Sequence, residues 1–76
     1  MSKIVYIYQS NDVIDVELHL SKIAALKSAL VDINSAFEVI TDELQTCIDG
    51  LKEHGRFYHD GVDICIMSIV DKRGNS

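Results

Sequence analysis

The side chains of this sequence that could do chemistry are three histidines, two cysteines and twelve acidic residues. The closest grouping is His54, His59 and Asp60, with Cys65 five residues further on. Zinc sites use nitrogen and sulfur ligands at short, regular spacings, which this grouping lacks. His54 falls where a helix should end and His59 beside a tight turn, so both have structural explanations. We therefore predict no metal site and no cofactor.

Neither cysteine has the sequence surroundings of a nucleophile. A reactive thiol needs a neighbour that stabilises the thiolate. Cys47 instead falls in an apolar helical series, and Cys65 lies between Ile64 and Ile66 in a run typical of a strand. The sequence contains no GxGxxG, Walker, GxSxG or HExxH motif. We therefore predict that the protein is not an enzyme.

The charge balance limits the kinds of partner. Seven Lys and Arg residues against twelve Asp and Glu residues give a formal net charge of −5, and the cations are scattered from Lys3 to Arg73. An acidic protein repels a phosphate backbone unless its cations gather on one surface. We expect no direct binding to nucleic acid and a protein partner with a basic surface.

Cysteine content and hydropathy indicate the compartment. Small secreted domains usually contain several disulfides, whereas this chain has only two cysteines without a motif spacing. The sequence shows no leader peptide and no apolar run near the ~20 residues of a membrane span. We therefore expect a cytoplasmic protein that does not contact a membrane.

Residues 3–20 predict an N-terminal β-hairpin. Residues 3–9, KIVYIYQ, are rich in β-branched and aromatic side chains, and turn residues follow at 10–12. Between residues 13 and 20, apolar residues at even positions alternate with Asp15, Glu17 and His19. The apolar residues are Ile14, Val16, Leu18 and Leu20. This period of two is typical of a strand with one buried face.

The length of the loop after Gln9 decides which face of the first strand is buried. With an even loop, Val5 and Ile7 join the apolar residues of the second strand inside. Tyr6 and Tyr8 then lie outside, next to Asp15 and Glu17. With a three-residue loop, the two tyrosines turn inward. The sequence leaves both registers open.

Residues 21–54 predict a helical region, with Ser21 as its N-cap and no proline. Its apolar residues repeat at alternating spacings of three and four for about four heptads. They are Ile23, Leu26, Leu30, Ile33, Phe37, Ile40, Leu44, Cys47 and Leu51. This pattern predicts one helix of roughly 50 Å, too long for a compact monomer of this size, whose apolar seam packs against a second copy. A helical hairpin broken near Asn34–Ser35 is the alternative.

Residues 56–70 predict a second hairpin. Asp60–Gly61 is typical of a two-residue type I′ turn, which would pair His59 with Val62 and Phe57 with Ile64. Residues 71–76 are expected to be a frayed tail. We thus predict a single α+β domain over residues 1–76, of order ββ-α-ββ, in which two hairpins flank one long amphipathic helix and the helix seam makes a homodimer.

These observations predict a small acidic binding protein, an adaptor or inhibitor that occupies a surface of a larger protein. Short acidic chains without motifs are often accessory products of phages or mobile elements. The predicted partner-binding residues combine exposed aromatic and thioether side chains with acidic ones. They are Tyr6, Tyr8, Asp15, Glu17, Tyr58 and Met67. Two alternatives stay open, a small-ligand binder with its pocket between subunits and an inhibitor that imitates DNA.

Overall fold

A computed structural model describes residues 2–70 of the chain as two hairpins flanking two helices. The elements are β1 (Ser2–Ser10), β2 (Val13–His19), α1 (Lys22–Ala36), α2 (Asp42–His54), β3 (Arg56–His59) and β4 (Val62–Val70). The predicted α+β class and the two hairpins are confirmed, and the predicted single helix is wrong. The predicted frayed tail, 71–76, lies outside the described residues. Between residues 2 and 70, no helix is long and apolar enough to cross a membrane.

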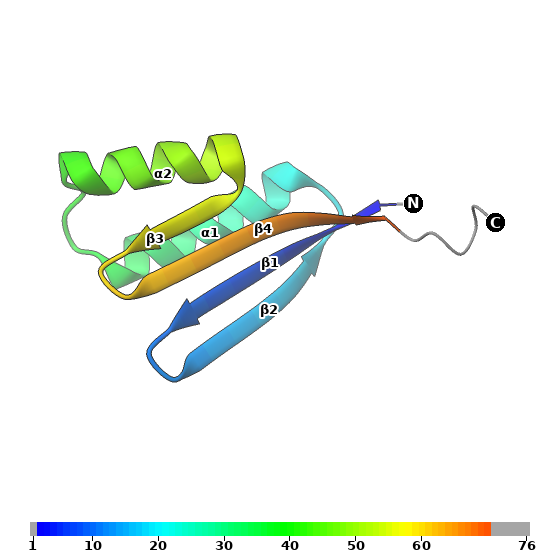
Figure 1. Cartoon of the computed structure of the whole chain (residues 1–76), viewed down its shortest axis with the longest axis horizontal. Coiled ribbons are helices and arrows are strands. Elements are labelled where there is room, and N and C mark those ends of the chain that lie inside the picture. The colour runs from blue at the N-terminus through cyan, green and yellow to red at the C-terminus, as the bar shows by residue number, and fades with distance from the viewer. Residues whose placement is uncertain (1, 71–76) are drawn as a thin grey trace.

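The four strands form one antiparallel sheet in the order β2-β1-β4-β3. Pairing of β1 with β4 joins the two hairpins at the centre of the sheet. Both helices lie on one side of this sheet, with α1 against β1, β2 and β4 and α2 mainly against β3 (Figure 1). No element of the described chain packs on the other side of the sheet, which we call the open face.

The first hairpin has a two-residue loop, Asn11–Asp12, with Ser10 opposite Val13. This is an even register, and it places Tyr6 opposite Glu17 as expected for such a loop. The helices, however, cover the face that bears Tyr6, which is completely buried. The expectation that an even loop leaves Tyr6 exposed is therefore wrong.

The physical reason is that β1 is apolar on both faces, so alternation could not show which face the helices cover. Val5 and Ile7 share the open face with the apolar residues of β2, the face that we expected to be inside. Tyr6 is accommodated inside because its ring packs in the core while its hydroxyl finds an acceptor on α1.

The helical region breaks after Ala36 rather than near Asn34–Ser35. Phe37 is extended, and its backbone N–H still donates to the Ile33 carbonyl at 3.0 Å. The second helix begins behind Thr41, whose hydroxyl accepts from the Leu44 N–H at 3.1 Å. The helical hairpin that we kept as the alternative is thus the correct arrangement, although its break lies further along the chain.

The predicted seam packs mostly against the chain's own sheet. Ile33, Leu44 and Leu51 are buried in the core, together with Ala25, Ala29 and Ile48 from the helices. Leu26, Leu30, Phe37 and Cys47 are partly buried against this core. Ile23 and Ile40 are exposed. Both helices turn their apolar side to the same sheet face, and this intrachain packing accounts for the seam, so most of it is not free for a second copy.

The second hairpin has the predicted register, with His59 opposite Val62 and Phe57 opposite Ile64. Asp60 and Gly61 both have positive φ angles, 50° and 83°, as a type I′ turn requires. Phe57, Val62 and Ile64 are therefore buried under the helices. The prediction from the Asp-Gly signal is confirmed.

Gly55 and Gly50 give a matched test of the junction between α2 and β3. Gly55 has φ +77° at the end of α2, and an added Cβ would lie 2.6 Å from the Ile66 backbone oxygen. Gly50 lies inside α2 with no atom within 4 Å of an added Cβ. We expect Gly55→Ala to lower the free energy of unfolding by about 1–3 kcal/mol. Gly50→Ala should raise it by about 0.5–1 kcal/mol.

Urea denaturation followed by circular dichroism measures both changes on the same chain. Because each variant adds one methyl group, a difference in sign reports the surroundings of each glycine, which at Gly55 are the positive φ angle and the close Ile66 oxygen. A Gly55→Ala protein as stable as the wild type would contradict the left-handed conformation at this junction.

Candidate functional site

The helix side of β2 is partly uncovered because the helices pack mainly over the other strands. Asp15 and Glu17 lie opposite Tyr8 and Tyr6 of β1, and residues directly opposite in an antiparallel pair share a face. Both acidic side chains are exposed, as the sequence predicted. The edge of β2 thus presents carboxylates toward the flank of α1.

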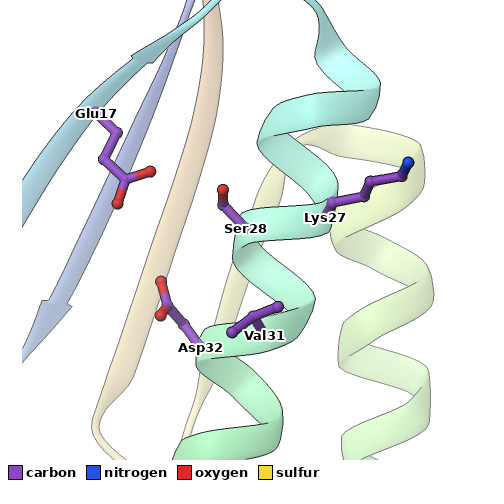
Figure 2. Close-up of a pocket in the computed structure, with 5 residues that line it drawn as sticks. All are labelled: Glu17, Lys27, Ser28, Val31 and Asp32. Carbon is purple, nitrogen blue, oxygen red and sulfur yellow. The ribbon is translucent and has the colours of Figure 1, made fainter.

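A cleft of about 310 Å³ lies between β2 and α1. It is lined by Glu17, Lys27, Ser28, Val31 and Asp32. Figure 2 shows the Glu17 carboxylate pointing from the strand toward the helix, and the Ser28 hydroxyl and the Asp32 carboxylate pointing from the helix toward the strand. Lys27 points away from β2 in the same view. We call this hollow the β2–α1 cleft.

Asp32 is held by the buried tyrosine beneath the cleft. The Tyr6 hydroxyl donates a hydrogen bond to Asp32 Oδ2. Burial, followed by this hydrogen bond and the negative charges of Asp32 and Glu17, raises the pKa of Tyr6 well above its ordinary value of 10.0. Tyr6 therefore stays protonated as a donor at physiological pH and fixes the orientation of the Asp32 carboxylate.

Glu17 has its own orienting contact on the strand. His19 Nε2 lies 2.9 Å from Glu17 Oε1, and the His19 ring lies 6.3 Å from the Tyr6 ring, centroid to centroid. Asp32 thus contacts Tyr6, Glu17 contacts His19, and the rings of Tyr6 and His19 pack against each other. The geometry of the two carboxylates is set before any ligand arrives, which reduces the entropy lost on binding.

The chemistry of the cleft is that of a hydrogen-bond acceptor with negative charge. Two carboxylates and one hydroxyl converge, and Lys27, the cation among the lining residues that the structure describes, points away from β2. A lysine ammonium or arginine guanidinium group is the natural complement of such an arrangement. For residues 2–70, no three His, Cys, Asp or Glu side chains are placed to hold one metal ion.

The six predicted partner-binding residues do not form one surface. Asp15 and Glu17 are exposed on the helix side of the sheet, where Tyr6 is buried and Tyr8 is half-buried. Tyr58 and Met67 are exposed, but they lie on the open face. The role of the six residues in binding a partner stays a prediction, and the structure places these residues on two different sides of the sheet.

Sequence reasoning missed the α1 residues that complete the cleft. Asp32 and Ser28 are half-buried and Val31 is 63% exposed, all on a helix that we expected to pack against a second copy. Only the hydrogen bond from Tyr6, which is 26 residues away in the sequence, reveals the position of Asp32.

The structure also brings Cys47 and His59 together, a pair that the sequence did not suggest. Cys47 Sγ lies 3.9 Å from His59 Nδ1, and the thiol donates to the Tyr58 carbonyl at 3.6 Å. The Phe37 ring meets the His59 ring edge-on at 5.3 Å. The thiol is thus engaged with the backbone and the imidazole with an aromatic ring, which accounts for both as packing contacts.

The open face of the sheet is a second surface that a partner can use. Its side chains are predominantly apolar, and several are about half exposed or more. The most exposed are Ile14, Val16, Leu18, Tyr58, Met67 and Ile69. A soluble monomer rarely exposes this many large apolar side chains side by side, so the face is a candidate interface.

Comparisons of the chain with protein family models, with curated proteins and with solved structures give no significant match. The two surfaces are therefore interpreted from their own geometry and charge.

The Tyr6–Asp32 contact makes the stability of the fold depend on pH in the alkaline range. Because the folded state raises the pKa of Tyr6 above 10.0, its contribution is complete below pH 10. Above pH 10 the unfolded chain releases the tyrosine proton while the folded chain retains it, so stability falls as pH rises. Tyr6→Phe removes this effect, and at neutral pH it should cost about 1–3 kcal/mol for the lost hydrogen bond.

Denaturation of the wild type and of Tyr6→Phe at a series of pH values from neutral to alkaline tests this expectation. The gap in unfolding free energy between the two proteins should narrow above pH 10. Tyr58→Phe is the control, because Tyr58 lies on the opposite side of the sheet from Asp32 and is 68% exposed within one chain. A constant gap across the range would show that Tyr6 does not hold its proton in this way.

Proposed function

We propose that this chain is a non-enzymatic binding protein that holds a basic segment of a larger protein in the β2–α1 cleft. The observation that carries the proposal is the convergence of the Glu17 and Asp32 carboxylates on one hollow whose cation, among the lining residues in the described part of the chain, is Lys27 and points away from β2. An adaptor or an inhibitor can act in this way, because occupying a basic surface blocks or redirects whatever that surface binds.

Electrostatics supports a basic partner at two distances. At long range, the net charge of −5 attracts a cationic surface and increases the rate of encounter. At short range, Asp15 adds a third carboxylate along the same face of β2. A guanidinium group can donate two parallel hydrogen bonds to the two oxygens of one carboxylate, and this geometry favours arginine over lysine.

The apolar part of the cleft fits the stem of a long cationic side chain. Val31 is 63% exposed and lies beside Asp32 on α1. Arginine and lysine bury their methylene groups along apolar surface while the charged end stays in a polar environment. Val31 can therefore contact the stem while Glu17 and Asp32 contact the charged end.

The cleft is less suited to the small-ligand alternative. At about 310 Å³ it is at the lower end of the range for small-molecule pockets, which are mostly apolar. Four of its five lining residues are polar or charged. It also lies within one chain rather than between subunits, where that alternative placed the pocket. A charged side chain presented by a protein is the better complement.

A labelled peptide tests the proposal directly. A fluorescein-labelled octapeptide of alternating arginine and serine is titrated with the protein by fluorescence anisotropy at about 0.15 M salt. We expect saturable binding by the wild type. The double variant Glu17→Gln with Asp32→Asn keeps the shape of the cleft and an acceptor for Tyr6, and it should weaken binding by about tenfold or more, or about 1.4 kcal/mol.

A second double variant controls for net charge. Glu38→Gln with Glu43→Gln also removes two negative charges, but from exposed positions away from the cleft. It should weaken binding much less than the cleft variant does. Equal losses in the two variants would mean that the peptide senses overall charge, and absence of wild-type binding up to millimolar concentration would remove the cleft as a site for basic segments.

A further inference from the structure

The open face of the sheet carries a continuous apolar surface across its strands. One cross-strand row consists of Leu18, Val5 and Met67, and the next begins with Val16, Ile7 and Cys65. Val5 is already buried between its neighbours, whereas the side chains around it remain exposed. A sheet with two apolar faces needs a layer on each of them, and the helices supply only one.

The size of this face matches what a stable interface requires. β1 and β4 contain nine residues each, β2 seven and β3 four. At about 3.4 Å per residue and about 4.8 Å between strands, these strands cover on the order of 500 Å² in projection. Because side chains project from the sheet, its accessible surface area is larger than this projected area. The face therefore supplies most of the ~800 Å² that each partner contributes to a standard interface.

The charge of the face identifies the kind of partner. The strand positions that face this side include only three charged residues, Lys3, Arg56 and Asp63. In a chain of net charge −5, the open face is thus close to neutral, and the acidic residues of β2 and of the helices lie on the other side. Each of two copies brings only one strand carboxylate, Asp63, to this face, so few like charges meet there, and a strongly basic partner finds little negative charge to pair with.

We propose that a second copy of the chain covers the open face, so that two sheets pack face to face between two outer layers of helices. Lys3 is near one end of the face and Asp63 near the opposite end, on neighbouring strands. A two-fold axis that lies between the two sheets and runs perpendicular to the strands brings the Lys3 end of each copy near the Asp63 end of the other. The same patch then serves both copies, as in most symmetric dimers.

This dimer differs from the one that the helical pattern predicted, and it is independent of the β2–α1 cleft. The cleft lies on the helix side of the sheet, so a dimer joined by the open faces presents two clefts outward. Two linked sites would bind a partner with two basic segments more tightly than one site does.

Light scattering with a matched pair of variants tests the interface. The wild type should have the mass of two chains at micromolar concentration. Val16→Glu places a charge on the open face, at a residue that is 61% exposed in one chain, and should raise the dimer dissociation constant by about a hundredfold or more. Ile23→Glu adds the same charge at a residue that is 67% exposed on α1, within the formerly predicted seam, and should leave the mass unchanged.

The two cysteines provide a second measurement that does not rely on a disruptive change. Cys65 faces the open side of the sheet, whereas Cys47 is on α2. A bis-maleimide with an arm near the roughly 10 Å spacing of packed sheets should join two copies of a Cys47→Ser protein through Cys65. It should not join copies of a Cys65→Ser protein.

Each result decides for or against the open-face dimer. A wild-type mass of one chain at micromolar concentration overturns it. Dissociation by Ile23→Glu but not by Val16→Glu, or cross-linking through Cys47 alone, assigns the contact to the helices and overturns it as well. If Val16→Glu loses its circular dichroism spectrum, Val16→Thr with Leu18→Thr replaces it, because threonine favours strands while removing apolar contact. A folded double-threonine variant that keeps the wild-type dimer affinity contradicts the proposal.

Discussion

The rest of this structure depends on the covering of one face of a four-stranded sheet by two short helices. Leu44 and Leu51 from α2 and Ile33 from α1 pack on that face together with Tyr6 and Ile64 from the central strands. Because the helices are gathered over the core, the edge strand β2 is left partly bare on the same side. The buried core, the carboxylate-lined cleft and the uncovered sheet face all follow from this single arrangement.

The cleft illustrates how a core residue can prepare a surface site. Tyr6 contributes its ring to the core and its hydroxyl to Asp32, so the position of a surface carboxylate is tied to packing beneath it. His19 relates to Glu17 in a similar way from the strand. A site supported by buried or half-buried groups loses less freedom on binding than one built from free surface side chains.

Much of the fold could be predicted from local signals, and what failed depended on contacts between distant parts of the chain. Asp60–Gly61 specified both a turn and a register, because positive φ angles at two adjacent residues leave few other structures. The heptad spacing from Ile23 to Leu51 correctly marked an apolar side, but two helices on one sheet need the same periodicity as one helix in a dimer. The two-sided apolar character of β1 concealed which face is covered, and Asp32 joins the cleft only through the tertiary fold.

The pairing of β1 with β4 has a consequence for how the protein is made. Ser2 pairs with Val70 and Tyr6 with Ile66, so the central pair of the sheet joins opposite ends of the described chain. Contacts between residues far apart in sequence slow folding, since a long loop must close before they form. During synthesis the first hairpin emerges with apolar side chains on both faces of β1, before its neighbour strand β4 has been made. A nascent chain in this state is exposed to aggregation, and chaperone occupancy should be greatest between the emergence of β1 and that of β4.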